Sequence, residues 1–390
     1  MNKEVNSRNF LNVYPGFKEN SIKGRYITQP KIEEVLNKAK SQFEVAQVGS
    51  SFLNVPIHSI RIGSGSKKIL AWSQMHGNEG TTTKAICDLL NLFAEHKDDR
   101  EVRRILEECT FLVIPILNPD GAARYTRENV NKVDLNRDAN NLSEQESNVL
   151  RETYENFFPD FCFNLHDQRT IFSAGNTSKV ATVSFLSPAM NEERTVTAVR
   201  TKAMQVISYM NKQLQEYIPG QVGRYDDAFN INCTGDTFQS LETPTILFEA
   251  GHFPEDYQRE ETRKYIAFSI FAGLNSIATG KYEEYSSENY MEIPENHKNF
   301  YDIILRNALI KDQNLDVALQ FEEKLKGGDV HFLPRVQTMA PSLTYFGHRE
   351  FDCRGQRLKT GEGKWPIEND IVHTFLLNDE KLSIISQDNQ

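Results

Sequence analysis

The sequence predicts an α/β fold with a mixed, largely parallel sheet flanked by helices, followed by a small β-rich C-terminal domain. Short apolar strands alternate with amphipathic helices over residues 31–278, the pattern of a sheet covered on its faces. Polar residues follow several of these strands, where the sites of such sheets gather. Beyond residue 298, short strands separated by Gly and Pro replace the helices. We therefore expect two domains, residues 1–282 and 298–390, joined by a polar linker.

The first half of the chain alternates strands and helices. We expect a helix over residues 31–41 and then two strands, VPIHSIRIG and KKILAWSQM, joined at GSGS by a tight hairpin. HGNEG turns into the helix TTTKAICDLLNLFAEH. A second short helix leads to the apolar strand TFLVIPIL, which ends in the turn NPDG.

The second half of this region continues the alternation. Ser143 to Glu146 has the S-x-x-E pattern of a capping box and predicts the start of the helix ESNVLRETYENFF. The strands DFCFNLHD and VATVSFL follow, and then a long helix near residues 192–217. The strand TPTILFEAG precedes a last helix, expected from Pro254 to about residue 278.

The composition is that of a globular protein of 390 residues. The chain has 44 basic and 54 acidic residues and a net charge of −10, which argues against nucleic acid or an anionic membrane as the main partner. No apolar run reaches the roughly 20 residues of a membrane span, and we find no signal-peptide core. The five cysteines lack C-x-x-C spacing and are expected to be buried thiols. These features favour a cytoplasmic protein.

Four residues near strand ends carry the chemistry that we expect. His76 and Glu79 form an H-x-x-E pair at a strand-to-helix turn, and His166 ends an apolar strand. Catalytic zinc usually has three protein ligands and one open position, so His166 is the candidate third ligand. Glu249 ends another strand and is the candidate general base. Each signal is weak alone, but HGNEG, NPDG, VDLNRD, NLHD and LFEAG together in one chain indicate a shared zinc site.

With these motifs, the region from about residue 22 to 280 resembles the carboxypeptidase A-like zinc peptidase family. The resemblance implies one zinc ion per chain, held by His76, Glu79 and His166, with Glu249 as the catalytic glutamate.

The resemblance also implies roles for residues that interact with the substrate. Asn136 and Arg137 in VDLNRD match the pair that grips a terminal carboxylate, a task that suits the planar fork of arginine. Arg127 matches the arginine that polarises the carbonyl, with Arg124 as a close rival. Tyr225 is the candidate for the tyrosine that covers the substrate, although a packed loop tyrosine is an equal alternative.

The sequence departs from the digestive enzymes of this family. His166 is followed by Asp-Gln-Arg rather than by a serine-tyrosine pair. HGNE and the aspartate after the third ligand also resemble the succinylglutamate desuccinylase and aspartoacylase branch. We expect a metallocarboxypeptidase whose substrate is a peptide or N-acyl amino acid with a free carboxylate. The alternatives are a zinc deacylase or amidase acting on N-acyl amino acids or cell-wall peptides, and a non-catalytic peptide-binding module. For the C-terminal domain, the sequence leaves three roles open: a folding chaperone, a lid or a contact of a homo-oligomer.

Overall fold

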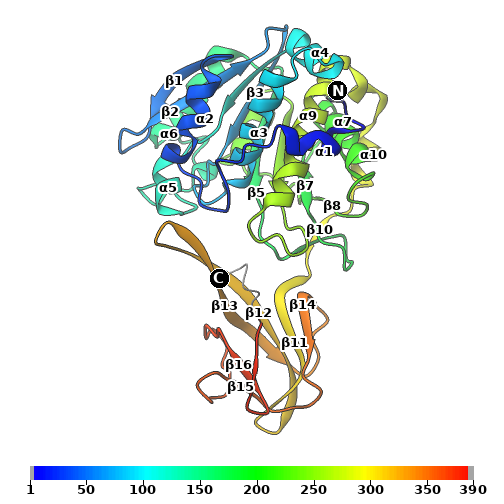
Figure 1. Ribbon diagram of the computed structural model, residues 1–390. Coiled ribbons are helices and arrows are strands. Elements are labelled where there is room, and N and C mark those ends of the chain that lie inside the picture. The colour runs from blue at the N-terminus through cyan, green and yellow to red at the C-terminus, as the bar shows by residue number, and fades with distance from the viewer. Residues whose placement is uncertain (1–3, 385–390) are drawn as a thin grey trace.

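A computed structural model describes residues 4–384. It has an α/β part and a second part built of strands alone, which projects from one side of the first (Figure 1). The fold class predicted from the sequence is confirmed for both parts.

An eight-stranded sheet forms the centre of the first part, in the order β1-β2-β4-β3-β5-β9-β7-β8. The strands from β4 to β9 in this order run parallel, whereas β1, β2 and β7 pair antiparallel with their neighbours β2, β4 and β9. Their bounds are β1 Glu44–Ser50, β2 Pro56–Ile62, β3 Lys67–Ser73, β4 Cys109–Ile114, β5 Phe161–Asp167, β7 Val183–Leu186, β8 Val222–Arg224 and β9 Thr245–Ala250.

The two strands joined by GSGS are not neighbours, so the predicted hairpin was wrong. β4 lies between them and pairs antiparallel with β2 and parallel with β3. The connecting loop must therefore cross the start of β4. Gly65 permits this approach, because a Cβ atom there would lie 1.8 Å from the backbone carbon of Glu108.

Helices cover both faces of the sheet. α3, α7 and α9 pack on the face that carries Phe163 and Phe248, whereas α6 and α8 pack on the face that carries Trp72 and Cys162. In the described part of the chain, no helix is long and apolar enough to cross a membrane. The helices are α1 Phe10–Val13, η1 Tyr14–Gly16, α2 Gln29–Ala39, α3 Thr81–Glu95, α4 Arg100–Glu108, α5 Pro119–Arg124, η2 Leu135–Arg137, α6 Gln145–Phe157, α7 Ala198–Leu214, α8 Thr234–Ser240 and α9 Glu260–Thr279.

The predicted capping box does not form. α6 begins at Gln145, and its N-cap residue Glu144 makes no capping hydrogen bond. The Glu146 carboxylate instead accepts hydrogen bonds from the Phe52 backbone amide at 3.2 Å and from Asn129 at 3.4 Å. Tertiary hydrogen bonds therefore occupy the Glu146 side chain, which the local sequence pattern predicted to cap the helix.

The second part consists of a four-stranded sheet, β13-β12-β11-β14, and a three-stranded sheet, β15-β16-β17. It has its own hydrophobic core, in which Ile303, Leu319 and Phe375 are fully buried. The strands are β11 Phe300–Ile310, β12 Gln313–Lys326, β13 Asp329–Ala340, β14 Phe346–Asp352, β15 Leu358–Thr360, β16 Phe375–Leu377 and β17 Glu380–Leu382.

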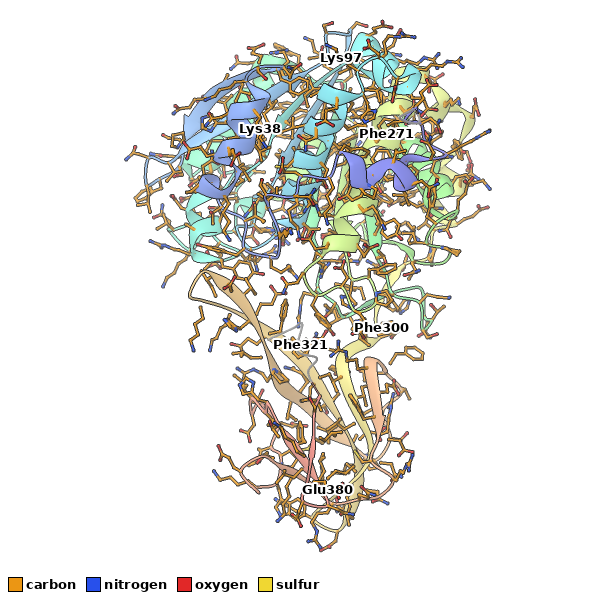
Figure 2. The ribbon with its side chains drawn as sticks, viewed as in Figure 1. Lys38, Lys97, Phe271, Phe300, Phe321 and Glu380 are labelled. Carbon is orange, nitrogen blue, oxygen red and sulfur yellow. The ribbon has the colours of Figure 1, made fainter. Side chains whose placement is uncertain are left out.

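The segment expected to be a polar linker is folded. It forms η3 Lys281–Glu284 and α10 Ser287–Met291, which packs on α7 and buries Tyr290. The next strand, β10 Asn296–Lys298, pairs antiparallel with β6 Phe172–Ala174 of the first part. Phe300 and Phe321 lie at the junction (Figure 2). Paired strands, rather than a free tether, therefore join the two parts.

Candidate metal centre

The three candidate ligands come together at one end of the sheet. His76 and Glu79 lie in the turn between β3 and α3, and His166 is the penultimate residue of β5. β3 and β5 are adjacent and parallel, so their carboxyl ends meet at the same edge. Ligand atoms of all three side chains lie within 4.8 Å of one another.

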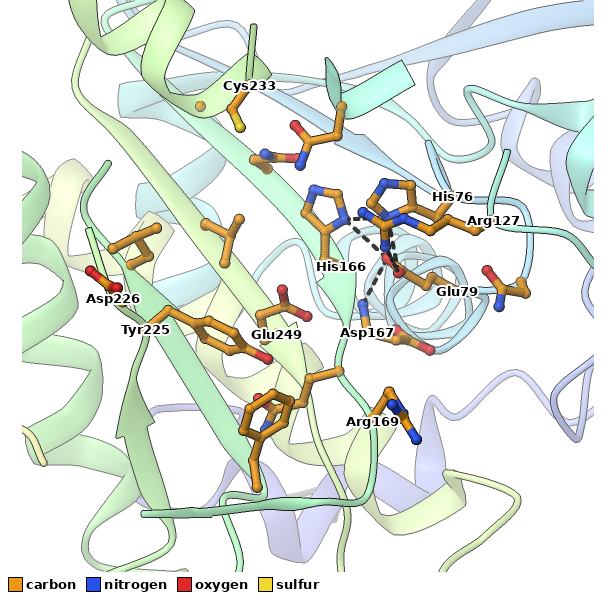
Figure 3. Close-up of a pocket in the computed structure, with 18 of the residues that line it drawn as sticks. His76, Glu79, Arg127, His166, Asp167, Arg169, Tyr225, Asp226, Cys233 and Glu249 are labelled. Atoms are coloured by element: carbon orange, nitrogen blue, oxygen red, sulfur yellow. Dashed lines mark hydrogen bonds and ion pairs between the residues drawn. The ribbon is translucent and has the colours of Figure 1, made fainter. Parts of the chain in front are cut away.

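The contacts within this group are short (Figure 3). The Glu79 Oε1 atom lies 2.9 Å from His76 Nδ1, and the Glu79 Oε2 atom lies 2.9 Å from His166 Nδ1. The two Nδ1 atoms are 3.1 Å apart. Two imidazole nitrogens and a carboxylate that converge in this way suit a shared cation, and this donor set is typical of catalytic zinc.

The charge states of Glu79 and His166 also fit zinc. Burial raises the pKa of Glu79, but the charges and hydrogen bonds of His76 and His166 outweigh it and hold that pKa well below its usual range. Burial lowers the pKa of His166, which keeps its ring neutral at neutral pH. Burial also acts to lower the pKa of His76, but the Glu79 charge and an Asp134 hydrogen bond raise it overall. Zinc takes an ionised carboxylate and deprotonated imidazole nitrogens as ligands.

Asp134 is a functional candidate that the sequence analysis missed. Its Oδ1 atom lies 3.0 Å from His76 Nε2, and its Oδ2 atom accepts a hydrogen bond of 3.0 Å from Arg127 Nε. A hydrogen bond at Nε2 orients the His76 ring and leaves Nδ1 to face Glu79 and His166. Asp134 lies in the motif VDLNRD, in which only Asn136 and Arg137 were predicted to be functional.

Glu249 faces the same cleft from β9 (Figure 3). Its Oε2 atom is buried and has no hydrogen-bond partner within residues 4–384. Burial raises the pKa of Glu249 well above its usual value, and the charges of Glu79 and Asp167 raise it further, while Arg127 acts to lower it. A carboxylate oxygen left without a partner at this place is available to accept a proton.

The cleft has a volume of about 670 Å³ and is lined by all the predicted substrate-binding residues. Asn136 and Arg137 come from η2. The Asn136 side-chain oxygen accepts a hydrogen bond of 3.1 Å from the Thr234 amide, and Arg137 donates one of 2.7 Å to the Asn136 carbonyl. Neither contact involves a carboxylate, so the remaining donors of Arg137 are open to an anion.

Arg127 lines the cleft and Arg124, in the last turn of α5, does not. Arg127 forms ion pairs with Asp134 at 3.0 Å and Glu79 at 3.4 Å, and 47% of its side chain remains exposed. Arg127 is therefore the arginine placed beside the candidate ligands.

Tyr225 follows β8, and its ring points into the cleft toward Glu249 (Figure 3). The ring packs edge-on against Phe172, with 5.3 Å between centroids. Burial raises the pKa of Tyr225, as does the charge of Glu249, so the hydroxyl stays protonated.

Several lining residues carry no motif and are brought in by tertiary folding. Two of them belong to β12 of the second part, which therefore forms one wall of the cleft. The unpredicted lining residues with polar or aromatic side chains include Arg25, Arg169, Asp236, Phe321 and Glu323.

Residues 30–219 match the family described as zinc carboxypeptidase. The chain contains a zinc carboxypeptidase domain. The matched range includes the three candidate ligands and the Asn136–Arg137 pair, and it ends before Tyr225 and Glu249. The match bears out the predicted family for residues 30–219, and that family implies a zinc cofactor.

Curated relatives match part of this chain. Carboxypeptidase 2 of Trichophyton rubrum is 30% identical over 112 residues, which cover 28% of this chain and 20% of that protein. Gamma-D-glutamyl-L-diamino acid endopeptidase 1 of Lysinibacillus sphaericus is 34% identical over 80 residues, 19% of this chain and 20% of that protein. The matches span about a fifth of the length of these relatives.

Solved structures share the fold. A metallo-carboxypeptidase from Burkholderia cenocepacia superposes with a TM-score of 0.53 at 14% identity, covering 65% of this chain and 70% of that one. A metallo-carboxypeptidase from Pseudomonas aeruginosa, in complex with (2-guanidinoethylmercapto)succinic acid, gives 0.51 at 16% identity, covering 65% and 69%. At these identities the similarity concerns the fold alone, and it confirms the predicted fold class.

Proposed function

We propose that this protein is a zinc-dependent metallocarboxypeptidase that hydrolyses the C-terminal peptide bond of a substrate with a free carboxylate. One observation carries the proposal. A single cleft holds the His76–Glu79–His166 group, the Glu249 carboxylate and the Arg137 guanidinium. Among residues 4–384, the Glu249 Oε2 atom has no hydrogen-bond partner and Arg137 has no carboxylate partner.

The residues divide the chemistry among them. His76, Glu79 and His166 would hold a zinc ion, which would lower the pKa of a bound water and polarise the scissile carbonyl. Glu249 takes the water proton and passes it to the leaving amine. The raised pKa of Glu249 favours keeping that proton until the amine receives it, and the positive charges of Arg127 and Arg259 act in the opposite sense.

The arginines and the tyrosine hold the substrate. Arg127 has exposed donors beside the candidate ligands and stabilises the negative charge that develops on the carbonyl oxygen. Asn136 and Arg137 bind the terminal carboxylate, with the arginine fork supplying two parallel donors. Tyr225 covers the bound residue next to Glu249.

A deacylase or amidase acting on N-acyl amino acids or cell-wall peptides is the second candidate. The aspartate that follows His166 favours it, and so does the similarity to the gamma-D-glutamyl-L-diamino acid endopeptidase. A non-catalytic binding module is disfavoured, because the ligand group and the candidate base are both present in the cleft.

A substrate panel tests the proposal on zinc-loaded protein. The panel holds an N-acetylated dipeptide as the free acid, the same dipeptide as the C-terminal amide, and the corresponding N-acetyl amino acid. The free acid should be cleaved about 30-fold or more faster than the amide, since only the free acid forms charge-assisted hydrogen bonds with the Arg137 guanidinium, worth about 2 kcal/mol. Faster cleavage of the N-acetyl amino acid than of the dipeptide would instead support the deacylase. Equal rates on acid and amide would contradict carboxylate anchoring.

A further inference from the structure

Four arginines line the cleft. Two of them form ion pairs with carboxylates, and among the described residues the other two do not. Arg25 forms an ion pair of 3.1 Å with Glu323, and Arg127 forms one of 3.0 Å with Asp134. Arg137 and Arg169 form no ion pair with any residue between 4 and 384. In a chain with a net charge of −10, two cleft guanidinium groups without carboxylates are two open sites for anions.

These two open arginines lie on opposite sides of the candidate ligands. Arg137 is close enough to Cys233 and Asp236 to affect their pKa values through its charge. Figure 3 shows Cys233 on one side of His166 and Arg169 on the other. A substrate whose terminal carboxylate sits on Arg137 therefore extends its acyl side across the ligand group toward Arg169.

The second part of the molecule fixes the segment that carries Arg169. The next residue, Thr170, is held twice: Gln320 donates to its hydroxyl at 2.7 Å and His348 donates to its carbonyl at 2.8 Å. The Phe300 amide then donates to the Ile171 carbonyl at 3.1 Å. The backbone on the C-terminal side of Arg169 is thus positioned by β11, β12 and β14.

β12 also supplies part of the wall of the cleft that Arg169 lines. Phe321 and Glu323 are two residues apart on the strand, so both face the cleft. The Phe321 ring packs edge-on against Tyr257, with 5.0 Å between centroids. Glu323 binds Arg25 and accepts a hydrogen bond from the Tyr125 hydroxyl. Its charge is therefore matched within the wall and does not oppose an anion bound at Arg169.

Building on the proposed function, we propose that Arg169 forms a second anion-binding subsite on the acyl side of the scissile bond. The substrate class is then a short peptide or acyl amino acid that carries an acidic group on each side of the cleaved amide: the terminal carboxylate on Arg137, and the carboxylate of an acidic acyl residue on Arg169. The second part of the molecule acts in selectivity by positioning Arg169 through Thr170 and by closing the cleft with Phe321.

Three N-acetylated dipeptides that differ only in the acyl residue test this subsite. Their acyl residues are Glu, Gln and Lys, and the C-terminal residue is the same. In the zinc-loaded protein, kcat/KM for the Glu dipeptide should exceed that for the isosteric Gln dipeptide at least about 10-fold, the scale of one charge-assisted hydrogen bond. Arg169→Gln should bring this ratio close to one. Arg103→Gln, on the exposed face of α4, is the matched control and should leave the ratio unchanged.

The outcomes separate this inference from the proposed function. Cleavage of the Glu and Gln dipeptides at equal rates would overturn the subsite and leave the carboxypeptidase intact. If no dipeptide is cleaved, the proposed function fails, and the subsite is decided by calorimetric binding of the Glu and Gln dipeptides to Glu249→Gln protein. Tighter binding of the Glu dipeptide, lost on adding Arg169→Gln, would support the subsite, and equal affinities would overturn it.

Discussion

His166 and Glu249 occupy the same register position on the neighbouring parallel strands β5 and β9. Paired residues project from the same face of a sheet, so the candidate third ligand and the candidate base share one face. Leu165 and Phe248, one residue earlier, belong to the hydrophobic core on the opposite face. Backbone hydrogen bonds between two buried strands therefore set the spacing between the candidate third ligand and the candidate base.

The first prediction concerns the metal. The purified protein should contain close to one zinc per chain, and His166→Ala should lose most of it, because two remaining ligands do not hold catalytic zinc tightly. Metal content by mass spectrometry after dialysis measures this. His331→Ala, in β13 and outside the cleft, is the control and should keep its zinc. Full zinc occupancy in His166→Ala would show that another residue is the third ligand.

The second prediction concerns the base. Glu249→Gln should retain zinc and the fold yet lose at least about 10²-fold in kcat, because the amide has the same shape but cannot take up the proton at neutral pH. Steady-state kinetics and zinc content are measured on the same preparation. Turnover close to that of the parent protein would remove Glu249 from the mechanism.

The third prediction separates anchoring from transition-state stabilisation. Arg137→Ala should slow cleavage of the free-acid dipeptide about 30-fold or more and affect the C-terminal amide little. Arg127→Ala should slow both substrates by a similar factor, because both generate the same negative charge on the carbonyl oxygen. The ratio of kcat/KM on the two substrates is the measurement. An unchanged ratio in Arg137→Ala would place the carboxylate elsewhere.

The fourth prediction concerns pH and the junction between the two parts. His348 stacks on Phe300 with 4.6 Å between centroids, and burial lowers its pKa to about 4 from an ordinary value of 6.5. Between these values the unfolded chain binds more protons than the folded chain. Stability is therefore retained above pH 6.5 and lost as the pH falls toward 4, by at most about 1.4 kcal/mol per pH unit from this group.

Urea unfolding at pH 7.5 and 5.5 measures this loss. His348→Gln keeps a donor for the Thr170 carbonyl but does not titrate. Between pH 7.5 and 5.5, the urea midpoint of this variant should therefore fall less than that of the parent protein. Some fall should remain, because burial also lowers the pKa of the neighbouring His252 well below its usual value. Identical falls in the parent and the variant would show that His348 titrates normally.

Much of the fold was predictable because local patterns determine it. The apolar runs that become β4, β5 and β9 are buried along most of their length, and short apolar runs bounded by turn residues are typical of buried strands. Strand order was not predictable in this way. The insertion of β4 between β2 and β3 depends on hydrogen bonds between distant segments, and the GSGS loop carries no sign of it.

The residues of the candidate site likewise fall into those that the sequence predicts and those that it does not. His76, Glu79, His166 and Glu249 lie in short motifs at strand ends, where sequence position alone implies proximity. Arg169 and the β12 wall were not identified, because nothing near Phe321 in the sequence indicates that β12 lies against the cleft. That information exists only in the packing of one part of the molecule on the other.

The Arg25–Glu323 ion pair joins two residues that are made at very different times. Synthesis proceeds from the N-terminal side, and domains fold as they emerge from the ribosome. His76, Glu79, His166 and Glu249 therefore leave the ribosome well before the wall that Glu323 completes. In the growing chain, the segments that carry the candidate metal centre are therefore available to fold before the cleft wall that β12 supplies.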